Sequence, residues 1–203
     1  MGRLDITEHI FEEMRYILSV RKRKSIYRKG FKSSAVALIN HLYDGEYYLL
    51  FTLRSDKVKH HQGQISFPGG ARDANERLVD CAIRETKEEL DIELRKDELL
   101  GKIDDILTIS RFRVTPFVFF INKRDILEGI CPNDEIAEVL NIPLNFLLGY
   151  VPRVEDVKYG RLKIKQYFYD YKNYTIWGAT GRILKQYLDL LSMVIFKECG
   201  GKN

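Results

Sequence analysis

The chain has 203 residues, of which 45% are hydrophobic and 31% charged, and its formal net charge at pH 7 is +4. This length suits one well-buried domain and is short for two, and the composition excludes a disordered or low-complexity protein. No apolar run reaches the ~20 residues that a membrane-spanning helix needs, so no membrane partner is predicted and the expected location is the cytoplasm.

The N-terminal part of the chain is predicted to form a helix followed by a basic connector. Apolar residues recur at helical spacing over about 6–20, and Thr7 is the predicted N-cap. The connector contains Arg21-Lys22-Arg23-Lys24 and Arg28-Lys29. Such a run attracts phosphates or nucleic acid, but a solvated helix end and linker is the simpler interpretation, and we expect no nucleic-acid partner.

A β-hairpin and a short strand are predicted next. Residues 34–42 and 47–53 have strand character and are joined by Asp44-Gly45, a strong hairpin signal. A polar loop leads to a strand over 65–67, which Pro68-Gly69-Gly70 is predicted to end. Tyr47 and Phe67 are expected to lie in the core.

The rest of the chain alternates helical and strand-like patterns. A helix is predicted over 77–90, where apolar residues form a stripe at i, i+3, i+4, i+7 and i+11. The later elements are predicted as strands over 99–107, 114–121 and 139–142, a short helix after Pro143, a hairpin of 167–171 and 174–177, and a helix over 180–197. Trp177 is expected to pack the last helix against the sheet. This order predicts an α/β (α+β) fold, a single domain with a mixed β-sheet between helices.

Three glutamates on the helix predicted over 77–90 carry the strongest chemical signal. Glu85, Glu88 and Glu89 stand at i, i+3 and i+4, so their carboxylates share one region of the helix surface. Like charges this close repel each other, and a hard divalent cation would reverse the sign of that interaction. Mg²⁺ and Mn²⁺ prefer carboxylate and water oxygens and leave room for substrate phosphates.

The residues around this cluster favour a built site, although a simpler interpretation exists. Arg84 and Glu76 are eight residues apart and are expected to pair across the start of the helix, holding the preceding loop. Gly69-Gly70 allows a tight turn, so that a carbonyl can approach a metal ion. The simpler interpretation is a surface helix on which Arg84 and Lys87 neutralise the glutamates.

Residues 70–92, GARDANERLVDCAIRETKEELDI, resemble the Nudix signature G-x5-E-x7-R-E-U-x-E-E-x-G-U, where U is a bulky aliphatic residue. The residues in register are Gly70, Glu76, Arg84, Glu85, Glu88, Glu89 and Ile92. Thr86 replaces an aliphatic residue and is expected to stay within the packed stripe. Asp91 replaces the second glycine and is expected to end the helix in a left-handed conformation. The resemblance implies a Nudix hydrolase domain over 31–203, preceded by a helix and connector over 1–30.

A second motif lies upstream and resembles the extra signature of the coenzyme A pyrophosphatase subgroup, approximately LLTxRS-x3-R-x3-G-x3-FPGG. Here LFTLRS at 50–55, Gly63 and FPGG at 67–70 follow that pattern. Lys59 stands where the pattern has Arg, which keeps the positive charge but loses the bidentate fork. The resemblance covers roughly residues 31–190 and is strongest over 50–92.

The family pattern implies roles for individual residues. Mg²⁺ or Mn²⁺ would be held by Glu85, Glu88 and Glu89 with the Gly69 carbonyl. Catalysis would involve Glu85 and Glu88, and the base that activates water is either Glu85 or Glu135. Further implied are substrate binding by Arg54, Ser55 and Lys59, and a structural role in the motif for Gly70, Glu76 and Arg84.

The resemblance implies a metal-dependent enzyme that hydrolyses the pyrophosphate bond of coenzyme A or a derivative, giving 4′-phosphopantetheine and 3′,5′-ADP. Two alternatives stay open: a Nudix hydrolase of another nucleoside diphosphate compound such as ADP-ribose, and a non-catalytic nucleotide- or RNA-binding module on the same fold. The expected partner is a coenzyme A-like small molecule, and a homodimer is left open. No chemistry is assigned to the cysteines Cys81, Cys131 and Cys199, which have no CxxC spacing.

Overall fold

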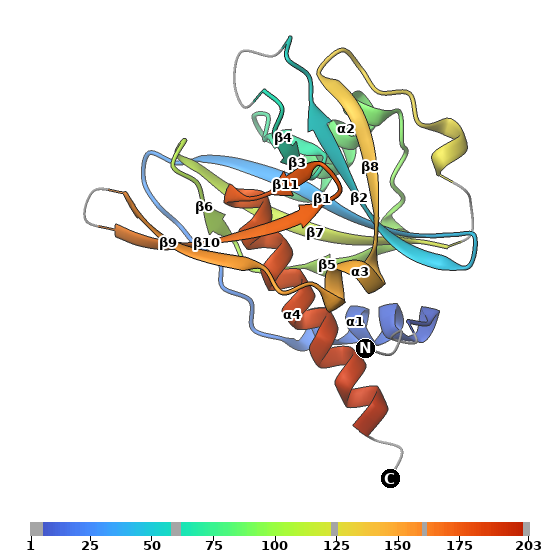
Figure 1. The fold of residues 1–203 in the computed structure, drawn as a ribbon. Helices are drawn as coiled ribbons and strands as arrows, with labels where there is room; N and C mark the ends of the chain where they lie inside the picture. The colour runs from blue at the N-terminus through green and yellow to red at the C-terminus, as the bar shows by residue number, and fades with distance from the viewer. Residues whose placement is uncertain (1–5, 58–61, 123–125, 160–161, 201–203) are drawn as a thin grey trace.

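The computed structural model describes residues 6–57, 62–122, 126–159 and 162–200. A large mixed sheet lies between helices in these residues, with a smaller antiparallel sheet beside it (Figure 1). The large sheet contains β1 (Lys32–Tyr43), β2 (Glu46–Arg54), β3 (Ile65–Ser66), β4 (Gly69–Ala71), β5 (Leu99–Lys102), β6 (Ile106–Leu107), β7 (Phe112–Ile121) and β8 (Ile136–Pro143). The smaller sheet contains β9 (Arg153–Tyr159), β10 (Leu162–Tyr171) and β11 (Tyr174–Ile176). The predicted mixed α/β fold is confirmed.

The helices divide between the two faces of the large sheet. They are α1 (Glu8–Val20), α2 (Leu78–Leu90), α3 (Leu144–Gly149) and α4 (Gly178–Gly200), with short 3₁₀ helices η1 (Lys96–Glu98) and η2 (Leu127–Gly129). Helix α2 packs on one face, whereas α1, α3 and α4 contribute to the hydrophobic cluster on the other. None of the described helices has both the length and the apolar character to cross a bilayer.

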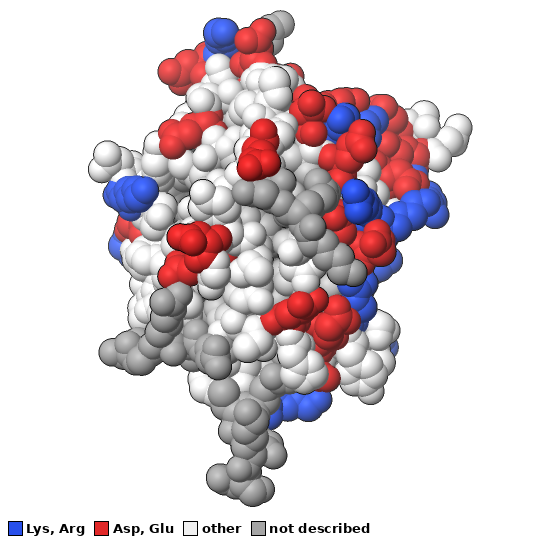
Figure 2. Space-filling model, turned by 90° about the vertical axis from the view of Figure 1, so that its right-hand side faces the viewer, with Lys and Arg blue, Asp and Glu red and all other residues white. Residues whose placement is uncertain are grey.

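The basic connector is exposed at Lys22, Lys24, Arg28 and Lys29, as expected for a solvated segment, but two of its arginines form ion pairs with the rest of the protein. Arg21 pairs with Asp104, and Arg23 Nη1 lies 2.7 Å from Asp105 Oδ1. Burial alone would raise the pKa of Asp105, but hydrogen bonds from Thr115, the Ile26 N–H and Arg23 hold this pKa below its usual value. On the face in Figure 2, the described Lys and Arg residues are scattered among Asp and Glu and form no continuous basic surface.

Strand β1 is paired along both of its edges. One edge pairs in parallel with β7 along 32–41. The other edge pairs with β2 through 40–43 and with β4 through 34–36, both antiparallel. β2 and β4 therefore pair with different parts of the same edge of β1. Gly69 and Gly70 lie in β4, which contacts α2.

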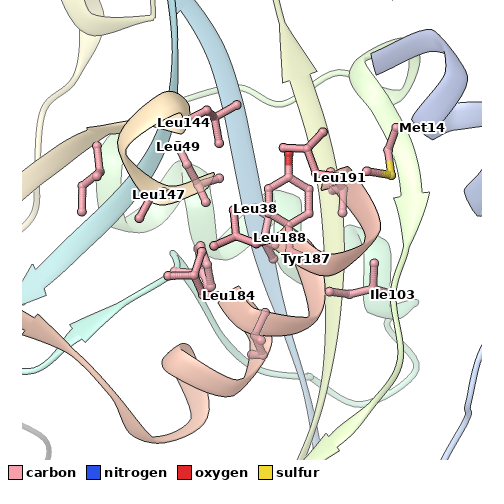
Figure 3. Packing of buried hydrophobic residues seen from close by; sticks show 14 of the residues in the cluster. Met14, Leu38, Leu49, Ile103, Leu144, Leu147, Leu184, Tyr187, Leu188 and Leu191 are labelled. Carbon is pink, nitrogen blue, oxygen red and sulfur yellow. The ribbon is translucent and has the colours of Figure 1, made fainter. Parts of the chain in front are cut away.

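The core on the face opposite α2 is closed by α4. Its buried residues Leu184, Tyr187, Leu188 and Leu191 point toward the sheet, as Figure 3 shows. Helix α1 joins the same core, because its Phe11 ring stacks on Phe120 with centroids 4.0 Å apart. The residues before the resembling segment therefore share a core with the sheet.

Replacing Tyr187 by Phe is expected to destabilise the protein by about 1–3 kcal/mol, because it leaves a buried acceptor without a donor. The Tyr187 hydroxyl donates to Asn40 Oδ1 over 2.6 Å, and Asn40 Nδ2 donates to the Phe119 carbonyl, all in the core. Urea denaturation measures the loss, with the exposed Tyr16→Phe as the control. Equal stability of Tyr187→Phe and the parent protein would contradict the prediction.

Several predicted elements are wrong in detail, each for a physical reason. The strand predicted over 99–107 is interrupted, because Asp104 and Asp105 turn away to bind the basic connector. Strand β3 ends before Pro68, as predicted, but Gly69 and Gly70 then begin a short strand, β4, that was not predicted. Strand β9 was not predicted at all. The Asp44-Gly45 turn has the expected positive φ angles, and Thr7 lies at the N-cap but makes no side-chain cap hydrogen bond.

Candidate active site

Helix α2 buries one face and presents acidic side chains on another. Its buried residues are Cys81, Ala82, Thr86, Glu89 and Leu90. Thr86 stays within this stripe, as expected, because its hydroxyl donates to the Ala82 carbonyl over 2.7 Å and needs no other partner. The polar substitution in the signature is therefore satisfied inside the helix.

The end of α2 is also as predicted. Asp91 adopts the left-handed conformation, with φ 60° and ψ 23°, and its N–H donates to the Lys87 carbonyl. The Lys87 Nζ contacts the Asp91 carboxylate at 2.5 Å, so Lys87 does not neutralise the three glutamates. A loop residue that was not predicted, Asn133, binds the last turn through the carbonyls of Glu88 and Glu89.

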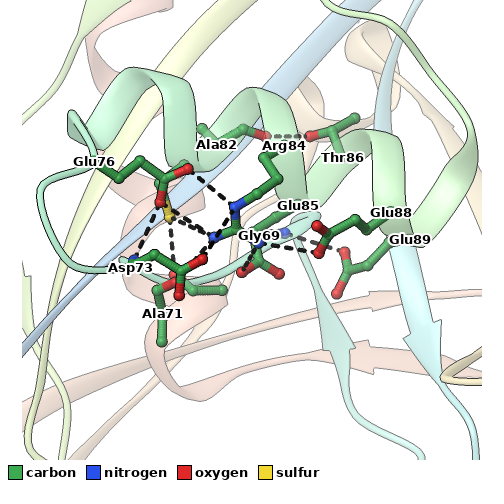
Figure 4. Close-up of polar contacts among 12 residues, drawn as sticks. Gly69, Ala71, Asp73, Glu76, Ala82, Arg84, Glu85, Thr86, Glu88 and Glu89 are labelled. Carbon is green, nitrogen blue, oxygen red and sulfur yellow. Dashed lines mark hydrogen bonds and ion pairs between the residues drawn. The ribbon is translucent and has the colours of Figure 1, made fainter.

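The three glutamates lie on the same side of α2, toward the strand that carries Gly69 (Figure 4). Their exposures differ: the side chain of Glu88 is 57% exposed, that of Glu85 18% and that of Glu89 8%. Glu89 accepts a hydrogen bond from the Gly69 N–H at 3.1 Å. Burial raises the pKa of Glu89 to about 7, although the Gly69 N–H and Arg54 counteract it. Burial also raises the pKa of Glu85.

Arg84 connects the cluster to the loop before α2. Its guanidinium lies 3.0 Å from each of Glu76, Glu85 and Glu88, and it also donates to the Ala71 carbonyl. The expected Arg84–Glu76 pair is confirmed, and the hydrogen bond from Arg84 lowers the pKa of Glu76. Arg84 thus neutralises part of the acidic cluster.

In the described part of the chain, no three carboxylate, imidazole or thiol side chains stand together as a ready metal site. The carboxylates of Glu85 and Glu88 both point to Arg84 Nη1, which lies between them. Gly70 lies against Glu85, because a Cβ atom built on Gly70 would be 2.3 Å from the Glu85 carboxylate. The Glu85 carboxylate thus occupies the space that a side chain at position 70 would need.

Arg54, at the end of β2, faces two carboxylates. Its Nη1 lies 3.9 Å from Glu89 and its Nη2 lies 3.3 Å from Glu135. Its Nε is buried without a hydrogen-bond partner among the described residues. Glu135 lies on a loop, as expected, and the Ser55 N–H donates to its carbonyl.

Of the other predicted substrate-binding residues, one has a local role and one is not described. Ser55 is buried, and its Oγ accepts a hydrogen bond from the Lys57 N–H at 3.2 Å, so it shapes the loop after β2. Lys59 lies outside the described residues, as do His60 and His61. Of the cysteines, Cys81 is buried with its pKa raised to about 12 by burial, Cys131 is exposed, and the side chain of Cys199 is not described.

A pocket of about 560 Å³ adjoins the acidic cluster through Arg54 and Gly69. Its further walls come from β3, β10, the segment between β6 and β7, and the start of α4. Trp177 lines this pocket and is 42% exposed, so the prediction that it packs the last helix on the sheet is wrong. Gln166 and Arg182, also in the wall, were not predicted, since no local pattern singles them out.

The comparisons with known proteins agree with this geometry. Residues 32–150 match the NUDIX domain family. The uncharacterized Nudix hydrolase NudL of Pectobacterium atrosepticum is 34% identical over 143 residues, which cover 68% of this chain and 72% of that protein. Nudix hydrolase 3 of Caenorhabditis elegans is 28% identical over 171 residues, covering 76% and 71%. The crystal structure of a MutT/nudix family protein from Enterococcus faecalis shares the fold, with a TM-score of 0.57, 13% identity and coverage of 92% and 75%.

Proposed function

The chain belongs to the Nudix hydrolase family, and we propose that it hydrolyses the pyrophosphate bond of coenzyme A or a derivative to 4′-phosphopantetheine and 3′,5′-ADP. The observation that carries this proposal is the buried Glu89 carboxylate, which lies beside Arg54 and Gly69 where the pocket meets the acidic cluster. The choice of coenzyme A rests on the motif over 50–70, which resembles that subgroup. The hydrolase domain is proposed to span 31–203, with 1–30 as an added helix and connector.

Nudix hydrolases generally depend on a divalent metal ion, and the residues present here fit one. The carboxylates of Glu76, Glu85, Glu88 and Glu89 outnumber the two guanidinium groups, Arg54 and Arg84, that contact them. Glu89 is a buried carboxylate whose raised pKa reflects incomplete compensation of its charge. The absence of a side chain at Gly70 is a second sign of a built site, because it lets the Glu85 carboxylate lie against the backbone of β4.

We assign Mg²⁺ or Mn²⁺ to Glu85, Glu88 and Glu89, with the Gly69 carbonyl completing the ligands. When bound, the ion polarises the pyrophosphate and lowers the pKa of the attacking water. Arg84 pairs with Glu76 and also contacts Glu85 and Glu88 directly, so it competes with the ion for the charge of these two carboxylates. Binding of the ion is therefore expected to weaken the contacts of Arg84 with these two carboxylates.

Arg54 is proposed to bind a substrate phosphate. Its Nε is a buried donor without a described partner, and its guanidinium stands between the acidic cluster and the pocket. Lys59, which lies outside the described residues, is proposed to bind a phosphate as well. Glu85 is the proposed base, because it is half-buried beside the other two glutamates, and Glu135, which contacts Arg54, is the rival.

The test compares coenzyme A, ADP-ribose and a dinucleoside tetraphosphate as substrates, each with Mg²⁺, with Mn²⁺ and with EDTA, and identifies the products by mass. We expect metal-dependent release of 4′-phosphopantetheine and 3′,5′-ADP from coenzyme A, with the highest kcat/KM of the three substrates. A higher kcat/KM for ADP-ribose would replace the proposed substrate. Absence of metal-dependent cleavage would favour the non-catalytic binder, although the ion-paired Arg21 and Arg23 leave that hypothesis less support.

A further inference from the structure

Gln166 of β10 is a buried side chain with an unused hydrogen-bonding atom. Only 5% of the residue is exposed, and its Oε1 has no hydrogen-bond partner among the described residues. A buried acceptor without a donor is costly, and native proteins leave few of them. Because Gln166 lines the pocket beside Gly69, a ligand in that pocket can supply the missing donor.

The rest of the pocket wall indicates what kind of group supplies it. The wall near Gln166 is mainly apolar, with Ile164 from the same strand and Trp177 before α4. The other apolar residues in the wall are Val36, Ile65, Phe67, Ile109, Val114, Ala179 and Ile183. A volume of about 560 Å³ is that of a small-molecule site, in which a few polar groups orient an otherwise apolar ligand. The matching group is an apolar or aromatic body that carries an N–H.

Arg54 lines the same pocket and has the complementary property. Its Nε is a buried donor without a hydrogen-bond partner among the described residues, and its guanidinium lies near Glu89. The pocket wall thus contains a donor for a phosphate oxygen at Arg54 and an acceptor for an N–H group at Gln166, alongside the apolar residues that line the rest of it.

We infer that Gln166 is a specificity-determining residue: its Oε1 accepts a hydrogen bond from an N–H of the substrate portion that occupies the pocket while the pyrophosphate lies at Arg54. This inference rests on the proposed function and adds to it the group that the pocket selects. Two parts of a coenzyme A-like substrate carry such an N–H, the amide-containing pantetheine arm and the amino group of adenine.

The test measures binding of the two products separately by calorimetry, so that no turnover is needed. In Gln166→Leu, the affinity for the product that occupies the pocket is expected to fall about tenfold, the effect of one lost hydrogen bond. A loss for 4′-phosphopantetheine identifies the pantetheine amide as the donor, and a loss for 3′,5′-ADP identifies the adenine amino group. Unchanged affinities for both products, or no binding of either to the parent protein, would overturn the inference.

Controls separate this effect from damage to the fold. Lys165→Leu introduces the same side chain at the exposed neighbour on β10 and is expected to leave both affinities unchanged. Gln166→Met, which keeps the length of the side chain without the amide oxygen, repeats the test if Gln166→Leu does not fold. With coenzyme A as substrate, KM is expected to rise about tenfold at unchanged kcat. If coenzyme A is not cleaved, the proposed function fails, and the calorimetry still decides the role of Gln166.

Discussion

Replacing Glu89 by Gln is expected to lower metal-dependent turnover more than 100-fold, because it removes a charge from the proposed metal ligands, and even the outer partners of a metal site are worth about 10–100-fold. Gln retains an oxygen that can accept the Gly69 N–H, so the turn at Gly69 is expected to persist. The measurement is kcat/KM for coenzyme A across a range of Mg²⁺ concentrations. The control is Glu93→Gln, just beyond α2, with a largely exposed side chain that contacts Lys87.

The same variant is expected to make the metal-free protein more stable at pH 8. Burial raises the pKa of Glu89 to about 7, so the folded state favours the neutral carboxyl and loses stability as the pH rises from about 4.5 through 7. Gln has no charge to bury, and the gain in the free energy of unfolding is expected to be about 1–3 kcal/mol at pH 8 and smaller at pH 5. Urea denaturation in EDTA at both pH values measures it. A less stable variant at pH 8 would show that Glu89 is not strained by burial.

Gly70→Ala is expected to lower mainly the activity of the protein, whereas Gly69→Ala is expected to lower mainly its stability. At Gly70, the added Cβ meets the far end of the Glu85 side chain, which can rotate away. We expect Gly70→Ala to fold with a loss of about 1 kcal/mol or less and to lose at least tenfold in kcat, because the proposed base and ligand is displaced. At Gly69, the added Cβ meets the Ala35 carbonyl at 2.3 Å and Val36 Cα at 2.6 Å, and φ is +147°.

Because backbone atoms cannot rotate away, Gly69→Ala is expected to destabilise the protein by about 3 kcal/mol or more. Thermal denaturation of both variants, together with kcat measured below their melting temperatures, separates the two effects. Gly45→Ala is the control for a glycine with positive φ and open space around it, which isolates the backbone strain. Equal stability of the alanine variants at 69 and 70 would contradict the assignment of the clash at Gly69 to the backbone.

The sequence was informative where the chemistry is local. The spacing of Glu85, Glu88 and Glu89, the pairing of Arg84 with Glu76 and the left-handed Asp91 all lie within 16 residues, so one helix and the turns at its two ends relate them. Strand β9 escaped prediction because four of its seven residues are charged and exposed, which hides the alternation of a half-buried strand.

The pocket could not be predicted for a different reason. Gln166 and Trp177 lie about 100 residues from Gly69 in the chain and line the same pocket because β11 contacts β3 and Thr180 of α4 donates a hydrogen bond to the Ile65 carbonyl. An isolated Gln in a strand has no spacing that marks it. Its unpaired oxygen becomes visible only when the tertiary structure shows which hydrogen bonds are made.

Asp105 links the N-terminal residues to the pocket. Its buried carboxylate is held by Arg23 and the Ile26 N–H, and three residues later the chain reaches Thr108 in the pocket wall. A domain boundary at residue 31 therefore separates two segments of the chain that the Asp105 carboxylate connects in the folded structure. Residues 23–26 thus hold, through Asp105, the segment that leads into the pocket wall, and exchanging them for those of another protein is expected to alter the shape that the ligand meets.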